Sequence, residues 1–228
     1  MKYRLLIIGV LTILTMNGCV IYNPQMTDIP LIAHKGDTRL DAGISLLTSA
    51  HATVSYGLTD KIAIQGFGSI GEDNRNYFQG AAGIYQNKSN NTVLETYAGF
   101  GYGHGKSWKS PDGVSLYGDY QLYFGQVNYG KIANEKSNFE TGIGLKAGYL
   151  HTNLTDRNYY EYTSEYGPFR NVHDKSILFE PAAFIRLGGK HVRFSLKLGG
   201  TYIYKFTNIG NDLPYASLNL GLGINYRF

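Results

Sequence analysis

The last twelve residues, 217–228, read SLNLGLGINYRF and alternate without interruption between two kinds of side chain. The apolar set is Leu218, Leu220, Leu222, Ile224, Tyr226 and Phe228. The small or polar set between them is Asn219, Gly221, Gly223, Asn225 and Arg227. Because successive side chains of a β-strand point to opposite faces of its sheet, this period of two predicts a strand with one apolar face. Alternation alone does not say whether that face meets a protein core or lipid.

The same period of two extends back through the chain to about residue 38. It predicts ten strands, at about 38–48, 51–59, 61–71, 76–87, 92–104, 116–130, 138–152, 175–188, 191–206 and 214–228. The composition agrees, because 29 glycines and 20 tyrosines among 228 residues are typical of strands and turns rather than helices. We therefore expect one all-β domain after a non-periodic N-terminal segment.

The lengths of the connections favour a membrane barrel, although two of the early loops are short. Tight turns at 58–61 and 188–191 contrast with longer loops at about 102–116, 152–175 and 205–214. Outer-membrane barrels combine short periplasmic turns with longer external loops, and carry aromatic girdles like the tyrosines near these strand ends. An open sheet edge in lipid would leave backbone groups unpaired. We therefore expect a closed antiparallel up-and-down transmembrane β-barrel of about ten strands, with eight or twelve as alternatives.

The first 18 residues read as an export signal. Lys2 and Arg4 precede an uncharged apolar stretch at 5–16, which is too short to span a bilayer and fits the core of a signal peptide. The motif MNGC, which ends at Cys19, resembles the lipobox of bacterial lipoproteins, although its first two residues depart from the usual ones. Cys19 is the only cysteine, so the chain has no internal disulfide. We expect lipidation of Cys19, with an ordinary secretion signal as the alternative.

Three stretches of the chain resemble bacterial outer-membrane β-barrel proteins. VSYGLTDKIAIQGFGSI at 54–70 resembles their strand–turn–strand unit, and ETYAGFGYGHG at 95–105 resembles their Gly/Tyr-rich strands. The C-terminal strand resembles the signal read by the barrel assembly machinery, carried here by Leu220, Leu222, Ile224, Tyr226 and Phe228. The resemblance implies a small Gram-negative outer-membrane barrel lipoprotein. Its expected parts are a signal peptide at 1–18, a lipidated cysteine and periplasmic tether at 19–37, and the barrel at 38–228.

The polar face of the expected strands carries charges that would line the lumen. They are Asp41, Glu95, Glu140, Lys146, Glu180, Arg186, Arg193, Lys197 and Arg227. Four acids and five bases are nearly balanced, which favours a paired network that fills the barrel. A conducting pore would use the same residues and stays open as an alternative.

Motifs for catalysis are weak. GYGHGKS at 101–107 lacks the first glycine of a phosphate-binding loop, and the histidines do not stand at metal-ligand spacing. His173, Asp174 and Ser176 suggest a hydrolase at the external rim, but neighbours along a strand point to opposite faces. We expect no enzyme, no metal and no cofactor. Two of the four net positive charges lie in the signal peptide, so the charge gives no argument for nucleic acid.

The leading hypothesis is an outer-membrane lipoprotein with a structural or surface-interaction role, a mostly filled lumen and a periplasmic N-terminus. A small diffusion channel, a rim-located enzyme and a soluble periplasmic lipoprotein that binds an apolar ligand are the alternatives. The expected partners are outer-membrane lipid and the assembly machinery. The tyrosine-rich loop at 152–175 suits binding of an extracellular protein or glycan.

Overall fold

The computed structural model describes residues 20–22, 28–45, 49–72, 74–109, 114–133, 138–156, 170–206 and 213–228. Its strands are β1 (Thr38–Ser45), β2 (Ser49–Gly57), β3 (Ile62–Gly71), β4 (Asn76–Lys88), β5 (Thr92–Lys109), β6 (Val114–Lys131), β7 (Phe139–Asp156), β8 (Arg170–Gly188), β9 (Val192–Gly200), β10 (Tyr202–Lys205) and β11 (Leu218–Arg227). One 3-10 turn, η1 (Ser89–Asn91), joins β4 to β5. Among the described residues, no helix is long and apolar enough to cross a membrane.

The strands close into a ring of antiparallel neighbours. Each strand from β1 to β8 pairs with the next, β8 pairs with β9 and β10, and β9 pairs with β11, which returns to β1. The strands β9 and β10 keep one register against β8 and are separated only by Thr201, so they act as a single strand. The result is a ten-stranded closed barrel, which confirms the expected fold class. Closure leaves no unpaired sheet edge.

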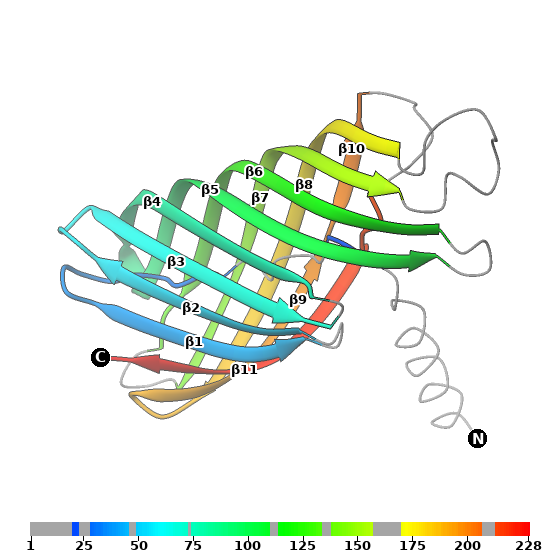
Figure 1. Cartoon of the computed structure of the whole chain (residues 1–228). Helices are drawn as coiled ribbons and strands as arrows, with labels where there is room; N and C mark the ends of the chain where they lie inside the picture. Colours follow the sequence, from blue (N-terminus) through cyan, green and yellow to red (C-terminus); the bar gives the residue numbers. More distant parts are fainter. Residues whose placement is uncertain are drawn as a thin grey trace, which may run out of the picture.

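Two ends of the barrel are distinguished by their connections (Figure 1). The turn end holds the connections β2–β3, β4–β5, β6–β7 and β8–β9, and Phe228 lies there too. The loop end holds the connections β1–β2, β3–β4, β5–β6, β7–β8 and β10–β11. Strands β5 to β8 reach further toward the loop end than their apolar alternation predicts, because backbone pairing continues where the side chains become polar.

The outer surface of the barrel is an apolar belt. Its most exposed members include Phe194 at 69% and Ile44, Ile70 and Ile84 at 63%, from four different strands. Side chains of this size would be buried in a water-soluble protein, so a belt on every side of the barrel indicates contact with lipid. At the turn end the belt finishes in aromatic rings, where Tyr226 and Phe228 meet edge to face with centroids 4.6 Å apart.

The C-terminal strand β11 shows the same division of faces. The apolar side chains of Leu218, Leu222, Ile224, Tyr226 and Phe228 are exposed on the outside, and Leu220 is half-buried. Asn219 and Asn225 are 2% and 1% exposed and point into the barrel. Its apolar face therefore meets the surroundings of the barrel rather than a protein core.

Candidate functional site

The lumen is occupied by the segment that precedes β1. We expected residues 19–37 to form a periplasmic tether, but most of the described residues 20–22 and 28–37, here called the N-terminal plug, are buried inside the barrel, and His34, Lys35 and Gly36 are exposed at its mouth. Ile21 is 1% exposed, and Tyr22 and Leu31 are fully buried. These apolar side chains would be costly to expose on a hydrated tether, whereas the barrel interior removes them from water.

The plug runs from the loop end to the turn end. Near the loop end, the backbone N–H groups of Ile21 and Tyr22 both donate to the carbonyl of Pro214, over 2.8 and 3.0 Å. Near the turn end, the N–H of Gly36 donates to the carbonyl of Gly57 over 2.8 Å. The described parts of the plug therefore lie at both ends of the lumen before the chain turns into β1.

Glycines on the inner wall make room for the apolar side chains of the plug. A β-carbon on Gly130 would lie 2.8 Å from Cδ1 of Leu31, and one on Gly144 would lie 3.0 Å from Cδ1 of Ile29. Both distances are shorter than ordinary carbon contacts, so larger residues would collide with the plug. Wall and plug are thus complementary in shape as well as in polarity.

Polar wall side chains satisfy the backbone of the plug. Gln126 Nε2 donates to the carbonyl of Asp28 over 2.9 Å, and Arg186 Nη2 donates to that of Ile29 over 3.0 Å. The N–H of Ile32 donates to Glu95 Oε1 over 2.7 Å. A buried backbone without a partner strand needs such bonds, because unpaired N–H and C=O groups are costly away from water. The plug is consequently held by side chains from several strands.

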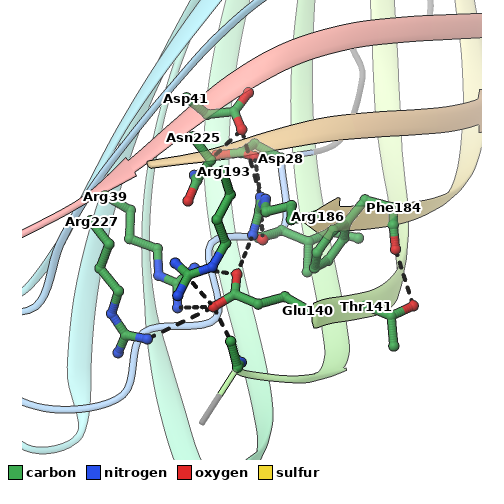
Figure 2. Close-up of polar contacts among 12 residues, drawn as sticks. Asp28, Arg39, Asp41, Glu140, Thr141, Phe184, Arg186, Arg193, Asn225 and Arg227 are labelled. Atoms are coloured by element: carbon green, nitrogen blue, oxygen red, sulfur yellow. Dashed lines mark hydrogen bonds and ion pairs between the residues drawn. The ribbon is translucent and has the colours of Figure 1, made fainter. Parts of the chain in front are cut away.

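Glu140 is the centre of an arginine cluster (Figure 2). Its Oε2 lies 2.9 Å from Arg39 Nη1 and 3.6 Å from Arg186 Nη1. Its Oε1 lies 3.6 Å from Arg193 Nη1 and 3.9 Å from Arg227 Nη1. One buried carboxylate therefore stabilises four guanidinium groups that approach from β1, β8, β9 and β11.

The plug contributes a carboxylate of its own to the network. Asp28 Oδ1 lies 3.3 Å from Arg186 Nη2 and 3.4 Å from Lys197 Nζ. Lys197 also bonds to Asp41, and Arg186 Nη2 lies 3.8 Å from Asp41 Oδ2. Two wall cations are thus shared between a carboxylate of the wall and one of the plug, which links the plug to the barrel electrostatically.

All nine charged residues expected in the lumen are on the inner wall. Eight of them are at most 5% exposed, and the side chain of Arg227 is 15% exposed. Within the described part of the chain, five further charged residues are buried as well but were not predicted to line the lumen: Asp28, Asp37, Arg39, Arg75 and Asp174. Two of the five, Asp28 and Asp37, belong to the plug. The available signal was the run of isoleucine and leucine at 29–32, which is too apolar for a tether.

A second ion pair lies apart from the Glu140 cluster. Lys146 Nζ lies 3.5 Å from Glu180 Oε2, and Glu180 Oε1 accepts a hydrogen bond from the Tyr22 hydroxyl over 3.0 Å. Glu95 instead binds neutral groups, the Asn128 amide over 3.0 Å and the Ile32 backbone. The predicted charges therefore form separate groups along the lumen, most of which touch the plug.

The rim residues considered for catalysis do not come together. His173 is exposed on the outer face of β8, whereas Asp174 and Ser176 are buried on its inner face. His104 pairs with Asp119 instead, Nδ1 to Oδ1 over 2.7 Å, at the loop end of β5 and β6. Within the described ranges, no three His, Cys, Asp or Glu side chains are placed to hold a metal ion.

Several expectations fall outside the described residues. These are the state of Cys19, the signal peptide and the tyrosines at 159–166. The phosphate-loop-like stretch at 101–107 is described and lies within the continuous strand β5, which extends to Lys109.

Comparison with known proteins identifies the fold. No protein-family model matches the sequence, and no curated protein matches it either. Among solved structures, the outer membrane protease OmpT from Escherichia coli aligns with a TM-score of 0.52 and 12% identity, over 85% of this chain and 94% of that one. A KdgM porin aligns with a TM-score of 0.40 and 8% identity, over 84% and 99% of the two chains. The alignment with OmpT shows that the chain has the fold of an outer-membrane β-barrel.

Proposed function

We propose that the protein is a lipid-anchored outer-membrane barrel with a structural or surface-interaction role, whose lumen is closed by its own N-terminal plug. The observation that carries the proposal is the series of bonds between plug and wall, from Tyr22 to Glu180, from Asp28 to Arg186 and Lys197, and from Ile32 to Glu95. A channel needs a path of water or weakly held sites through which solutes can pass. Paired charges and apolar side chains occupy that path here.

The same arrangement supports a specific topology for the N-terminus. If the turn end faces the periplasm, as in other outer-membrane barrels, Val20 emerges at the external mouth, where it packs against Ala216. Cys19 is joined to Val20 by one peptide bond. We therefore propose that an acyl group on Cys19 lies on the external side of the membrane. This proposal takes the place of the periplasmic tether that we predicted from the sequence.

Conductance in planar bilayers tests the closed lumen. We expect the wild-type barrel to be silent, whereas a variant with residues 20–36 replaced by a Gly/Ser linker of equal length should show discrete openings. Heat-modifiable migration on a gel verifies that both proteins fold. Wild-type openings as large as those of the linker variant would contradict the proposal.

A small diffusion channel is the second candidate. It is supported by two cavities at the turn end, of about 470 and 340 Å³, both of which are lined in part by Arg227 of the inner wall. Such a channel would require the plug to move. Rare wild-type openings that become frequent in Asp28→Asn, which removes a charge that holds the plug, would favour this candidate.

A further inference from the structure

A cavity of about 470 Å³ opens at the turn end, beside the last residues of β11. Its lining includes His34 of the plug and Lys190, His191, Arg193, Arg227 and Phe228 of the wall. No acidic side chain is among these described lining residues, whereas three are cationic and two are histidines. The plugged-lumen proposal assigns no role to this cavity.

The cations of the cavity differ in how well they are already paired. Arg227 donates to both carboxylate oxygens of Asp37, Nε over 2.9 Å and Nη2 over 2.7 Å, so its charge is largely compensated. Lys190 is exposed in the turn between β8 and β9. It is therefore available to a ligand that enters the cavity from solution.

Arg193 is a buried cation of the cavity, and two of its nitrogens have no hydrogen-bond partner within the described part of the chain. It is 5% exposed, and its Nε and Nη1 have no hydrogen-bond partner among the described groups. Its contact with Glu140, 3.6 Å from Nη1 to Oε1, is longer than a hydrogen bond, and that carboxylate already holds Arg39 at 2.9 Å. An anion in the cavity would meet the part of Arg193 that lines it, and would compensate a charge that Glu140 shares among four guanidinium groups.

We propose that the turn-end cavity binds a phosphate group, with Arg193 as the buried donor and Lys190 as the cation at the entrance. A guanidinium presents several N–H groups in a fork that matches the oxygens of a phosphate, and an ammonium adds a point charge from the other side. The phosphate belongs to a free ion or to a lipid headgroup, since Phe228 places the cavity beside the aromatic edge of the lipid-facing belt.

Calorimetry on the purified full chain, in phosphate-free detergent solution, tests the site with two probes, inorganic phosphate and dihexanoyl phosphatidic acid. We expect saturable binding of one probe per barrel. Lys190→Gln should weaken it about fivefold and Arg193→Gln about tenfold, because each removes one charge-assisted contact. Lys61→Gln, an exposed lysine in the β2–β3 turn that does not line this cavity, should leave it unchanged.

The two probes separate the two sources of phosphate. Tighter binding of phosphatidic acid supports a lipid headgroup, and binding of inorganic phosphate alone supports a free ion. Absence of saturable binding by both probes would overturn the proposal, as would an equal loss in Lys190→Gln and Lys61→Gln. Gel migration before and after heating reports folding, and the surface variant Lys190→Gln keeps the test valid if Arg193→Gln does not fold.

Discussion

Replacing Glu140 with glutamine should destabilise the barrel more than any other isosteric change in the lumen that we consider. The substitution keeps the shape of the side chain but removes the one negative charge shared by Arg39, Arg186, Arg193 and Arg227. The four guanidinium groups would then face each other in a buried space. The perturbation is therefore electrostatic rather than steric.

The magnitude follows from the contacts of the carboxylate. Removing one member of a buried ion pair costs about 3–5 kcal/mol, because the remaining charge stays desolvated. Glutamine keeps one oxygen that can accept from Arg39, and Arg186 and Arg227 retain Asp28 and Asp37 as partners. We therefore expect the lower part of that range, about 3 kcal/mol of unfolding free energy.

Glu95→Gln is the matched control. Glu95 is as deeply buried as Glu140, but its hydrogen-bond donors are the Ile32 backbone, the Asn128 amide and the Tyr97 hydroxyl, which are all neutral. An amide oxygen still accepts part of these bonds, so we expect a loss of about 1 kcal/mol.

Urea unfolding in phospholipid vesicles, followed by circular dichroism and by heat-modifiable gel migration, measures both variants. Adding Arg193→Gln to Glu140→Gln should recover part of the loss, because Glu140 is the one carboxylate that pairs with Arg193 among the described residues. The reasoning is refuted if Glu140→Gln costs no more than Glu95→Gln.

Two further substitutions test the outer belt and the plug. Leu222→Arg should cost about 2–4 kcal/mol of unfolding free energy, because it places a charge in the lipid-facing belt. The control Leu58→Arg, at the turn end, should cost about 0–1 kcal/mol. Equal urea midpoints for the two variants would contradict the lipid-facing assignment of Leu222. Gly144→Val should cost about 1–3 kcal/mol, because its side chain would collide with Ile29 of the plug and with the Asn128 amide of the wall. Gly66→Val, on the outer face of β3 with open space around its β-carbon, serves as its control, and an equal loss in both would argue against a tightly packed lumen at Gly144.

The barrel was predictable from sequence because each strand is indicated by residues that are neighbours along the chain. Side chains of a strand alternate regardless of which strand lies beside it, so the faces of residues such as Leu222 and Asn225 follow from period two alone. The charge alternation on those strands likewise placed all nine expected charges on the inner wall. Alternation does not predict which of these charges form ion pairs with one another.

The plug was not predictable in the same way, because its partners lie far along the chain. Ile32 bonds to Glu95, and Asp28 meets Arg186 and Lys197, across separations of 63 to 169 residues. The segment has no hydrogen-bonded ladder and therefore no periodicity to read. Residues 20–37 show no periodicity, but an exposed tether and a segment that is stabilised by wall side chains both lack it.

The placement of the N-terminal segment is tested most directly by pulsed electron resonance distances. The native Cys19, which adjoins Val20, carries one spin label in a refolded chain that starts at this residue. The second label is placed on Glu72→Cys at the loop end or on Lys190→Cys at the turn end. If the segment crosses the lumen, the distance to position 72 should be shorter than that to position 190 by about 20 Å, close to the height of an apolar barrel belt. A shorter distance to position 190 would show that the segment does not traverse the barrel.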